Sequence, residues 1–536
     1  MSEAPEGAAP SMARSVAGMG AAAAVSRTFG GLRVVVIAAV LGTTYLGNTF
    51  QASNSVSNVL FELLAAGALS AALVPTFVDL LGRGDQRRAE EVAGGILSLA
   101  LVALGVVSVL GIVFAPQLAR ALTAGVDDPA IAAQQQELAT YLLRFFVPQI
   151  LLYAVGAVTT AVLHARRSFL LPAIAPIGNT IVLVAALGLF HALAGPDPGL
   201  DLTNTEQLLL ALGGTLGVAA FVGVPAIGLR ASGFRLRMRN RRAVHDPDVR
   251  RALRLSGWAA LQHAGAGILL GAALVVGGAI EGGVVAYQFA MVVFLAPYGI
   301  VAQPIHTAVL PRLADDAARG DHAGLHRNAR WATDSMVVAT LPLAAGLVAL
   351  ALPIMRVLAF GAANDKDSVE LLAGALAGLA LGVTVYGSFL LLSRIAYAVG
   401  DTRTPAIAAL GSAALGAIGM IATGRWFDGA ARMVAIGAAH SVAYLVGSAV
   451  LLWRLHPVVG NLVRWSHAKA VALATVVGVL GWGVMDAWHP DGRITTLVAL
   501  AAVAGAGMAV YVAGVRVLRL SPGPAPALHA TVEHSA

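Results

Sequence analysis

The chain has 536 residues, of which 58% are hydrophobic and 12% charged, with a formal net charge of +7 and no cysteine. The charged fraction is about half that of an ordinary globular protein, which excludes a soluble fold, and the lack of cysteine excludes disulfides and cysteine-ligated metals. The basic residues lie in short segments between apolar runs rather than on one solvated domain, which argues against nucleic-acid binding.

Fourteen apolar runs follow along the chain, and each is long enough to cross a bilayer as a helix. Their approximate bounds are 15–42, 53–80, 92–115, 137–164, 171–194, 206–230, 254–280, 283–311, 332–358, 370–398, 405–424, 431–454, 467–487 and 494–518. Because the bilayer core holds no water, the backbone groups of such runs must be hydrogen-bonded within helices. We therefore predict an all-α polytopic membrane protein of about 14 transmembrane helices, with disordered cytoplasmic tails at residues 1–12 and 521–536.

The basic residues predict how these helices are oriented. Most of the 35 Lys and Arg residues lie on one side of the predicted membrane, above all in a linker at residues 231–253, and the loops on the other side are neutral to acidic. Cytoplasmic loops typically carry such an excess. The pattern predicts a multi-pass protein of the plasma membrane with both termini in the cytoplasm. It also predicts that the basic linker attracts anionic membrane lipids.

An internal repeat predicts two lobes. The segment from Pro75 to Asp85 recurs from Pro311 to Asp321, 236 residues later, and both copies end in Arg-Gly-Asp. We predict six-helix lobes at residues 13–230 and 254–455, followed by two further helices at 456–520. Parallel repeats of this kind are typical of transporters whose site lies between the lobes.

Four polar residues of the second run share one face. Gln51, Ser55, Asn58 and Glu62 follow the spacing i, i+4, i+7 and i+11, which stacks them along one stripe of a helix. Lipid cannot satisfy these groups, so the stripe must face protein or a wet cavity. Two interpretations stay open, because such residues also form hydrogen bonds between helices. We favour a cavity wall for the stripe, and an interhelical hydrogen bond for Asn58 taken alone.

Arginines within the apolar runs are the second candidate set. Ser26 and Arg33 share a face of the first run, and Arg27 lies about 100° around the helix from Ser26. An arginine near the bilayer centre costs at least about 2.5–3.5 kcal/mol. Arg27 can extend toward the cytoplasm, whereas Arg33 must either pair with Glu62 or bind an anionic substrate. Arg144, in the fourth run, is predicted to be a further buried arginine.

The chain lacks the motifs of several enzyme classes. It contains no Gly-Lys-Ser/Thr phosphate-binding loop and no His-Glu-x-x-His, and it has only two lysines, Lys366 and Lys469. An internal ATPase and a zinc hydrolase are therefore not expected. We predict that the protein is not an enzyme and has no catalytic residue, metal or cofactor.

Four segments carry a resemblance to a known family. They are SRTFGGLR at 26–33, NVLFELLAAGALSAALVP at 58–75, PAIAPIGN at 172–179 and YAVGDTRTP at 397–405. The chain resembles the MurJ/MviN family of lipid II flippases, within the multidrug/oligosaccharidyl-lipid/polysaccharide exporter superfamily. The resemblance implies fourteen helices in two lobes around a central cavity. It also implies that Ser26, Arg27 and Arg33 handle the diphosphate of an undecaprenyl-linked peptidoglycan precursor.

The chain departs from that family at several cavity positions. Ungapped alignment puts Phe61 and Val292 where relatives hold arginines, and Ala66 and Asn48 where they hold acids. We hypothesise a rearranged set of charges, in which Glu62 and Arg144 compensate for these losses.

These patterns together predict a transporter. The expected activity is flipping of lipid II from the inner to the outer leaflet by alternating access, with a cavity lined by Ser26, Arg27, Arg33, Asn58, Glu62 and Arg144. One alternative is a cation-coupled drug or polysaccharide-lipid exporter of the same superfamily, which would bind a cation through Glu62. Another is a membrane scaffold that recruits proteins of cell-wall synthesis or division.

Overall fold

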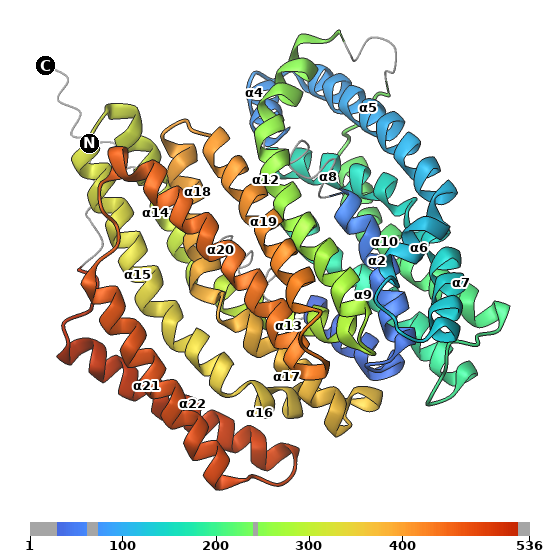
Figure 1. The fold of residues 1–536 in the computed structure, drawn as a ribbon. Coiled ribbons are helices and arrows are strands. Elements are labelled where there is room, and N and C mark those ends of the chain that lie inside the picture. The colour runs from blue at the N-terminus through green and yellow to red at the C-terminus, as the bar shows by residue number, and fades with distance from the viewer. Residues whose placement is uncertain (1–28, 62–72, 239–244, 524–536) are drawn as a thin grey trace, which may run out of the picture. The chain divides into compact units, whose positions relative to one another are not determined.

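The computed structural model describes residues 29–61, 73–238 and 245–523 (Figure 1). These residues form helices and contain no strand, which confirms the predicted all-α class. Within them, eleven helices are long and apolar enough to cross a membrane, or twelve if the bent pair of α17 and α18 is one span. The first two predicted runs, 15–42 and 53–80, extend into residues outside the described ranges.

The contacts divide the chain into two units, with the division after Val285. The first unit, with a short return at Phe360–Ala363, holds the helix Phe29–Leu41, α2 (Tyr45–Phe61), α4 (Leu73–Gly82), α5 (Gln86–Val113), α6 (Ala115–Leu122), α7 (Pro129–Phe146), α8 (Gln149–Ala165), α9 (Leu170–Ala194), α10 (Asn204–Ala231), α12 (Pro247–Gly278) and η3 (Gly361–Ala363). Helix α13 (Gly283–Pro297) begins just before the division.

The second unit contains the remaining helices. They are the π-helix η2 (Tyr298–Ala302), α14 (Gln303–Arg319), α15 (His322–Ala349), α16 (Ala351–Leu358), α17 (Lys366–Ala380), α18 (Val383–Ala398), α19 (Arg403–Thr423), α20 (Gly429–Val459), α21 (Trp465–Trp488) and α22 (Arg493–Val517). The contacts place α12 with the first unit, where it packs on α2, α5 and α6. The lobes at 13–230 and 254–455 stay a prediction from the internal repeat.

The core of the first unit is built from large apolar side chains and close helix contacts. Phe50 of α2 and Phe146 of α7 are fully buried, and their rings meet edge to face with centroids 5.8 Å apart. Helices α9 and α10 pack closely because Gly213 faces Ala186, where an added Cβ would lie 2.5 Å from the alanine Cβ. Small residues allow this approach, and helix association in lipid depends on such packing.

The second unit has the same kind of close helix packing at glycines, between α17 and α20. A Cβ on Gly378 would lie 2.3 Å from the carbonyl oxygen of Val434, and a Cβ on Gly437 would lie 2.5 Å from the backbone nitrogen of Leu379. Neither position can hold a larger residue without moving a helix. The final pair, α21 and α22, pack on each other, and α21 also packs on α15.

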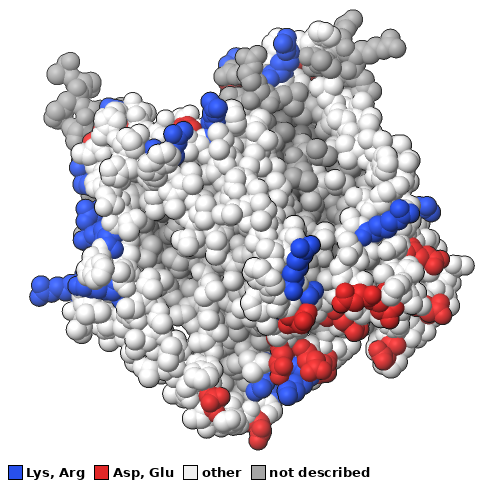
Figure 2. All heavy atoms as spheres, viewed as in Figure 1, with Lys and Arg blue, Asp and Glu red and all other residues white. Residues whose placement is uncertain are grey.

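The outer surfaces of these helices suit a membrane. Many large apolar side chains are exposed, such as Val109 at 61%, Ile418 at 63% and Val479 at 59%. Figure 2 shows that most of the face in view carries neither acidic nor basic side chains. Because water would not tolerate so much exposed apolar surface, lipid is the medium that these faces fit.

Both copies of the repeated segment form the same turn. Gly84 and Gly320 have positive φ angles of 76° and 68°, which glycine adopts without strain. Asp85 and Asp321 follow and begin α5 and α15, and each carboxylate accepts a hydrogen bond from the backbone N–H three residues later, at 2.9 and 2.8 Å. Such caps satisfy a helix N–H that lacks a partner. The sequence repeat is thus a structural repeat at these turns.

After α10 the chain crosses back over α5, in a segment that we call the first strap (residues 233–238). Phe234 is buried among the side chains of α5 and α8. The Arg237 Nε donates to Glu90 Oε2 at 2.9 Å. A Cβ on Gly94 would lie only 2.0 Å from the carbonyl oxygen of Arg237. The strap can follow this path only because α5 has glycine at that position.

The start of α12 is fixed to α5 by a second set of charges. Arg88 donates to both carboxylate oxygens of Asp246, at 2.8 and 2.7 Å, and to Asp248 at 3.1 and 2.6 Å. Burial by itself would raise the pKa of the Asp246 carboxyl, but the hydrogen bonds and charge of Arg88 outweigh it and hold the pKa below its ordinary value. Forked arginine–carboxylate pairs of this kind are among the stronger polar contacts in proteins.

After α20 the chain crosses over α15 in a segment that we call the second strap (residues 460–464). Leu462 is buried in the cluster that includes side chains of α15. The Arg464 Nη1 donates to Asp334 Oδ2 at 3.0 Å, and His467 Nε2 lies 2.7 Å from Asp334 Oδ1. Because His467 belongs to the first turn of α21, this anchor also holds the start of the final helix pair.

Candidate functional site

Arg33 lies on the helix Phe29–Leu41 with its Nε atom buried. Among the described residues this Nε has no hydrogen-bond partner. Among the described residues of the same unit, Tyr153 of α8 lies close enough to influence the Arg33 charge. A phenol hydroxyl is neutral, so it cannot neutralise a guanidinium as a carboxylate would. The structure therefore places a cation in a short apolar helix, with one donor that the described residues leave unused.

Tyr153 is itself held by a polar chain between helices. Its hydroxyl hydrogen-bonds with Ser57 of α2. The Ser57 Oγ lies 3.3 Å from Gln149 Oε1, and the Gln149 Nε2 donates to Thr215 Oγ1 of α10 at 3.2 Å. The Tyr153 ring also packs against Phe61, with centroids 5.4 Å apart. Phe61, one of the departures from the family pattern, thus lies against the tyrosine next to Arg33.

The polar residues of α2 are buried, as an internal face requires. The buried set is Asn48, Thr49, Gln51, Ser53, Asn54, Ser55 and Ser57. Of the predicted stripe, Gln51 and Ser55 are buried and Asn58 is partly exposed. Ser26, Arg27 and Glu62 lie outside the described residues. The ion pair between Arg33 and Glu62 and the roles of Ser26 and Arg27 therefore stay predictions.

Part of this polar face joins helices together. Gln135 Nε2 of α7 donates to Thr49 Oγ1 and to the carbonyl oxygen of Tyr45, both at 3.2 Å. Asn48 Nδ2 donates to the carbonyl oxygen of Ile280 at 2.6 Å, and its Oδ1 accepts from the backbone N–H of Val284 at 2.9 Å. These interhelical contacts involve residues outside the predicted stripe, so both interpretations of the stripe stay predictions. Asn48, which stands where relatives hold an acid, has this structural role.

Other polar atoms of α2 have no partner among the described residues. Gln51 Nε2 and Asn54 Oδ1 are buried and make no hydrogen bond there. Ser53 Oγ and Gln135 Oε1 are also unpaired, but both residues line a cavity of about 10 Å³, which is about the space of one water molecule. A water can account for that second pair. Gln51 Nε2 and Asn54 Oδ1, like Arg33 Nε, therefore stay without a partner among the described residues.

The prediction that Arg144 is a buried arginine is wrong. Arg144 is exposed in the last turn of α7, and it lines a polar cavity that also contains Arg120. Arg33 and Tyr153 are not among the residues of that cavity. The apolar run around Arg144 masked this, because hydrophobicity shows that a helix is embedded but not which of its faces meets a cavity.

Sequence reasoning missed Tyr153, Asn54 and Arg120. Tyr153 and Asn54 carry no charge and sit in helices whose average composition is apolar or small, so no single residue stood out. Arg120 lies in α6, an eight-residue helix that is too short to have been recognised as a membrane run. Its signal was the amphipathic pattern, with Ala115 and Ala119 buried and Arg120 exposed.

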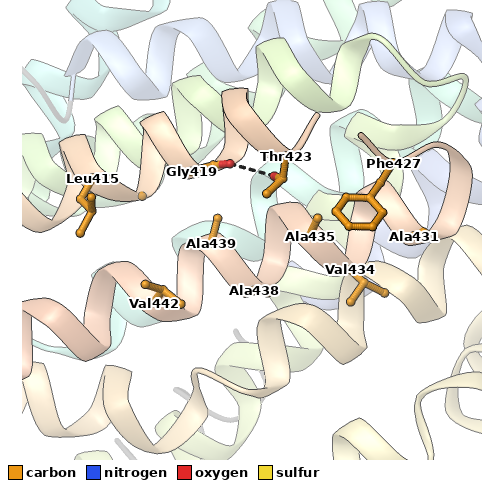
Figure 3. A pocket seen from close by; sticks show the side chains of 11 residues that line it. Leu415, Gly419, Thr423, Phe427, Ala431, Val434, Ala435, Ala438, Ala439 and Val442 are labelled. Atoms are coloured by element: carbon orange, nitrogen blue, oxygen red, sulfur yellow. Dashed lines mark hydrogen bonds between the residues drawn. The ribbon is translucent and has the colours of Figure 1, made fainter. Parts of the chain in front are cut away.

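A larger cavity in the second unit has different chemistry. It has a volume of about 660 Å³ and lies between α19 and α20 (Figure 3). Leu415, Val434, Val442 and several alanines line it, and Thr423 is the polar exception. The Thr423 hydroxyl donates to the carbonyl oxygen of Gly419 at 2.8 Å, so it is already satisfied. This groove fits an apolar chain and offers no charge to a headgroup.

No cluster of three or more His, Asp or Glu side chains that could hold a metal ion occurs within the described ranges. The polar groups described above around Arg33 and α2 are an arginine, a tyrosine, amides and hydroxyls. These groups donate hydrogen bonds, and the guanidinium attracts anions.

Comparisons with known proteins agree with this architecture. A family model described as "Lipid II flippase MurJ" matches residues 37–503. A probable lipid II flippase MurJ of Rhizobium tropici is 29% identical over 518 residues, which is 92% of each chain. That of Vibrio cholerae is 26% identical over 510 residues, covering 91% of this chain and 93% of its own.

Solved structures share the fold. Lipid II flippase MurJ in an inward closed conformation has a TM-score of 0.71 at 19% identity, covering 93% of this chain and 98% of its own. An inward-facing multidrug resistance transporter of the MATE family has a TM-score of 0.61 at 15% identity, covering 81% and 95%. Because the family model matches most of the sequence, this chain belongs to the MurJ family of lipid II flippases.

Proposed function

We propose that this protein flips lipid II from the inner to the outer leaflet by alternating access, and that Arg33 binds the diphosphate of the lipid. Membership of the family and the many apolar helices make it a multi-pass protein of the inner membrane and a member of a transporter family. The observation that carries the role of Arg33 is its buried Nε, which has no hydrogen-bond partner among the described residues.

The physical argument starts from the cost of that arginine. A guanidinium within a bilayer costs at least about 2.5–3.5 kcal/mol, and Tyr153 offers only a neutral hydroxyl. A diphosphate offers two anionic groups whose oxygens match the fork of a guanidinium. Binding the substrate would therefore satisfy a donor that has no hydrogen-bond partner among the described residues. Gln51 and Asn54 would supply an amide donor and an amide acceptor to the sugar and peptide parts of the headgroup.

Residues outside the described ranges complete this proposal. Ser26 and Arg27 would help to hold the diphosphate, and Glu62 would neutralise Arg33 when no substrate is bound. Asn58, which is partly exposed, would contact the same ligand. A charge role for Glu62 predicts that neither Glu62→Gln nor Glu62→Ala supports growth. Growth with Glu62→Gln but not with Glu62→Ala would contradict it.

Two further features of the proposal concern the cytoplasmic side. Both termini would lie in the cytoplasm, with the basic linker on that side. Arg230 at the end of α10 and Arg235 within the first strap are exposed, and they would attract anionic headgroups. Proteins of cell-wall synthesis or division are the partners that we would expect for a flippase that supplies their substrate.

The test is conditional depletion of the protein, followed by rescue with wild type or with variants. The measured quantity is the amount of lipid-linked precursor accessible at the outer face of the membrane. Wild type should restore it, and Arg33→Ala should not. Arg33→Lys, which keeps the charge but loses the fork, should restore it only in part.

The control is Arg83→Ala, because Arg83 is an exposed arginine of the same unit whose ion pair among the described residues is with Asp79, one helical turn away. It should rescue like wild type at equal membrane levels. Full rescue by Arg33→Ala would remove Arg33 from the mechanism. Undiminished outer precursor after depletion would favour a scaffold. Loss of organic-cation export without loss of precursor would favour a drug exporter.

A further inference from the structure

The polar cavity that contains Arg144 is separate from the Arg33 region and has its own chemistry. It has a volume of about 430 Å³ and lies between α6, α7 and the first turn of α10. Its polar side chains include Arg120, Gln136, Glu137, Tyr141, Arg144 and Gln207. Residues 136, 137, 140, 141 and 144 of α7 contribute to it, so one face of that helix over about two turns forms its wall.

The side chains of the two arginines of this cavity have no partner among the described residues. Arg120 and Arg144 are both exposed, and neither makes an ion pair or a side-chain hydrogen bond with another described residue. Two guanidinium groups that line one cavity repel each other unless an anion lies between them. Glu137 offers one carboxylate, which leaves the cavity with a net positive charge.

The walls of the cavity are held in place by contacts of their own. Thr203 and Glu206 form a capping box at the start of α10, with the Thr203 N–H donating to Glu206 Oε2 at 2.8 Å. The Gln136 Nε2 donates to Thr123 Oγ1 at 3.1 Å, which joins α7 to the end of α6. Asp128 caps the start of α7. Because these contacts already hold the wall in place, little conformational entropy is lost there when a ligand binds.

The cavity lies at the end of the unit away from the basic linker. The linker contacts the start of α5 and follows the end of α10, whereas the cavity uses the start of α10 and the helix after α5. A helix of 28 residues such as α5 is about 42 Å long, close to the thickness of a bilayer with its headgroups. With the linker in the cytoplasm, the cavity is at the outer membrane surface.

The surface beside the cavity faces lipid. Val109, Val113 and Phe114, at the end of α5, are 61%, 63% and 50% exposed, and Pro116, two residues after Phe114, lines the cavity. The exposed apolar surface therefore reaches the edge of a positively charged pocket. A molecule with an apolar tail and an anionic head matches both surfaces at once.

We propose that this cavity binds the phosphate-bearing headgroup of a membrane amphiphile at the outer surface. Arg120 and Arg144 would bind the phosphate oxygens. Glu137, Gln136 and Gln207 would bind hydroxyl or amide groups of the head, and the tail would lie along the end of α5. This chemistry has two sources, a phospholipid such as phosphatidylglycerol and a lipid-linked saccharide diphosphate. The site is independent of the transport step, and it holds whether or not Arg33 binds a diphosphate.

The test uses the purified full chain in phosphatidylcholine nanodiscs and measures bound lipid by native mass spectrometry. One arm titrates phosphatidylglycerol, and the other titrates an undecaprenyl diphosphate-linked saccharide. The double variant Arg120→Gln with Arg144→Gln should bind at least one of them about tenfold more weakly or worse. Replacing both arginines by lysine should weaken binding less, because the charge is kept and the fork is lost.

The matched control is Arg83→Gln with Arg87→Gln. It removes the same charge from two exposed arginines of the same unit, whose ion pairs among the described residues are local ones with Asp79 and Glu91. Its binding should equal that of wild type. Weakening with one lipid alone assigns that source, and weakening with both assigns the shared phosphate chemistry. Binding of both lipids that is unchanged in the glutamine variant, or equally weakened in the control, would overturn the proposal.

Discussion

In both units the chain crosses back over an earlier helix that begins at a repeated Arg-Gly-Asp turn. The first strap lies over α5 and buries Phe234, and the second lies over α15 and buries Leu462. In each case an arginine of the strap binds a carboxylate of the helix below, Glu90 in one unit and Asp334 in the other. The path of the chain is alike in the two units, but the groups that fix it differ.

The two units differ in the segments that each carboxylate holds in place. Glu90 holds only its strap, and the start of α12 depends on Arg88 instead. Asp334 holds both Arg464 and His467, so a single carboxylate fixes the second strap and the start of α21. The second unit therefore fixes its strap and the following helix through one carboxylate, whereas the first unit divides these two tasks between Glu90 and Arg88. Substitutions should affect the two units unequally.

The largest effect is expected from Asp334→Ala. Breaking a buried ion pair costs about 3–5 kcal/mol, and the exposure of Arg464 should reduce this to about 2–3 kcal/mol. The midpoint of thermal unfolding of the purified protein should fall, and trypsin should cleave sooner after Arg464. Asp315→Ala is the control, because Asp315 is 60% exposed in its pair with Arg319. Equal losses in the two variants would contradict a special role for Asp334.

The next effect is expected from Gly94→Ala in the first unit. The new methyl group would meet the carbonyl oxygen of Arg237, and crowding of this kind costs about 1–3 kcal/mol. The unfolding midpoint should fall, and hydrogen exchange of the strap should speed up. Gly105→Ala, on the same helix with open space around the new Cβ, should change neither. Faster exchange in both variants would show that helix composition, and not the strap contact, is responsible.

A smaller effect is expected from Arg88→Gln. It removes the fork that holds Asp246 and Asp248, and because these groups are partly exposed the loss should be about 1 kcal/mol. Hydrogen exchange should increase at the start of α12 and stay unchanged in α21. Arg87→Gln, whose side chain is 78% exposed, should leave both regions as in wild type. Equal exchange at α12 in the two variants would argue against the role of Arg88.

The smallest effect is a dependence on acidity. The pKa of Asp246 is lower in the folded protein than its ordinary value of 3.8. Its contribution to stability is therefore complete above that value and is lost as the pH falls below it toward the folded-state pKa. The protection of amide hydrogens from exchange, relative to an unfolded chain at the same pH, should fall at the start of α12 in wild type over this acidic window. Arg88→Gln should show a smaller fall there, and an identical fall would mean that other carboxyls are responsible.

The sequence by itself determined the class of the protein. Lipid admits only apolar surfaces and internally bonded backbones, so the lengths of the apolar runs predicted a helical membrane protein before any contact was known. The Arg-Gly-Asp repeat was likewise readable, because a glycine with positive φ followed by a capping aspartate is a local arrangement. Local backbone geometry and the surrounding lipid both restrict which residues can follow one another, so both can be read from the sequence.

Only the tertiary structure decided which polar groups are already hydrogen-bonded and which lack a partner among the described residues. Asn48 and Gln135 join helices, whereas Arg33 keeps a buried donor without a partner among the described residues. Arg144 lines a cavity together with Arg120, and Arg33 is not among the residues of that cavity. The periodicity of a helix shows that residues share a face, but the neighbour of that face comes from segments far away in the chain. Hydrogen bonds with those neighbours determine whether a polar residue is structural or free to bind a ligand.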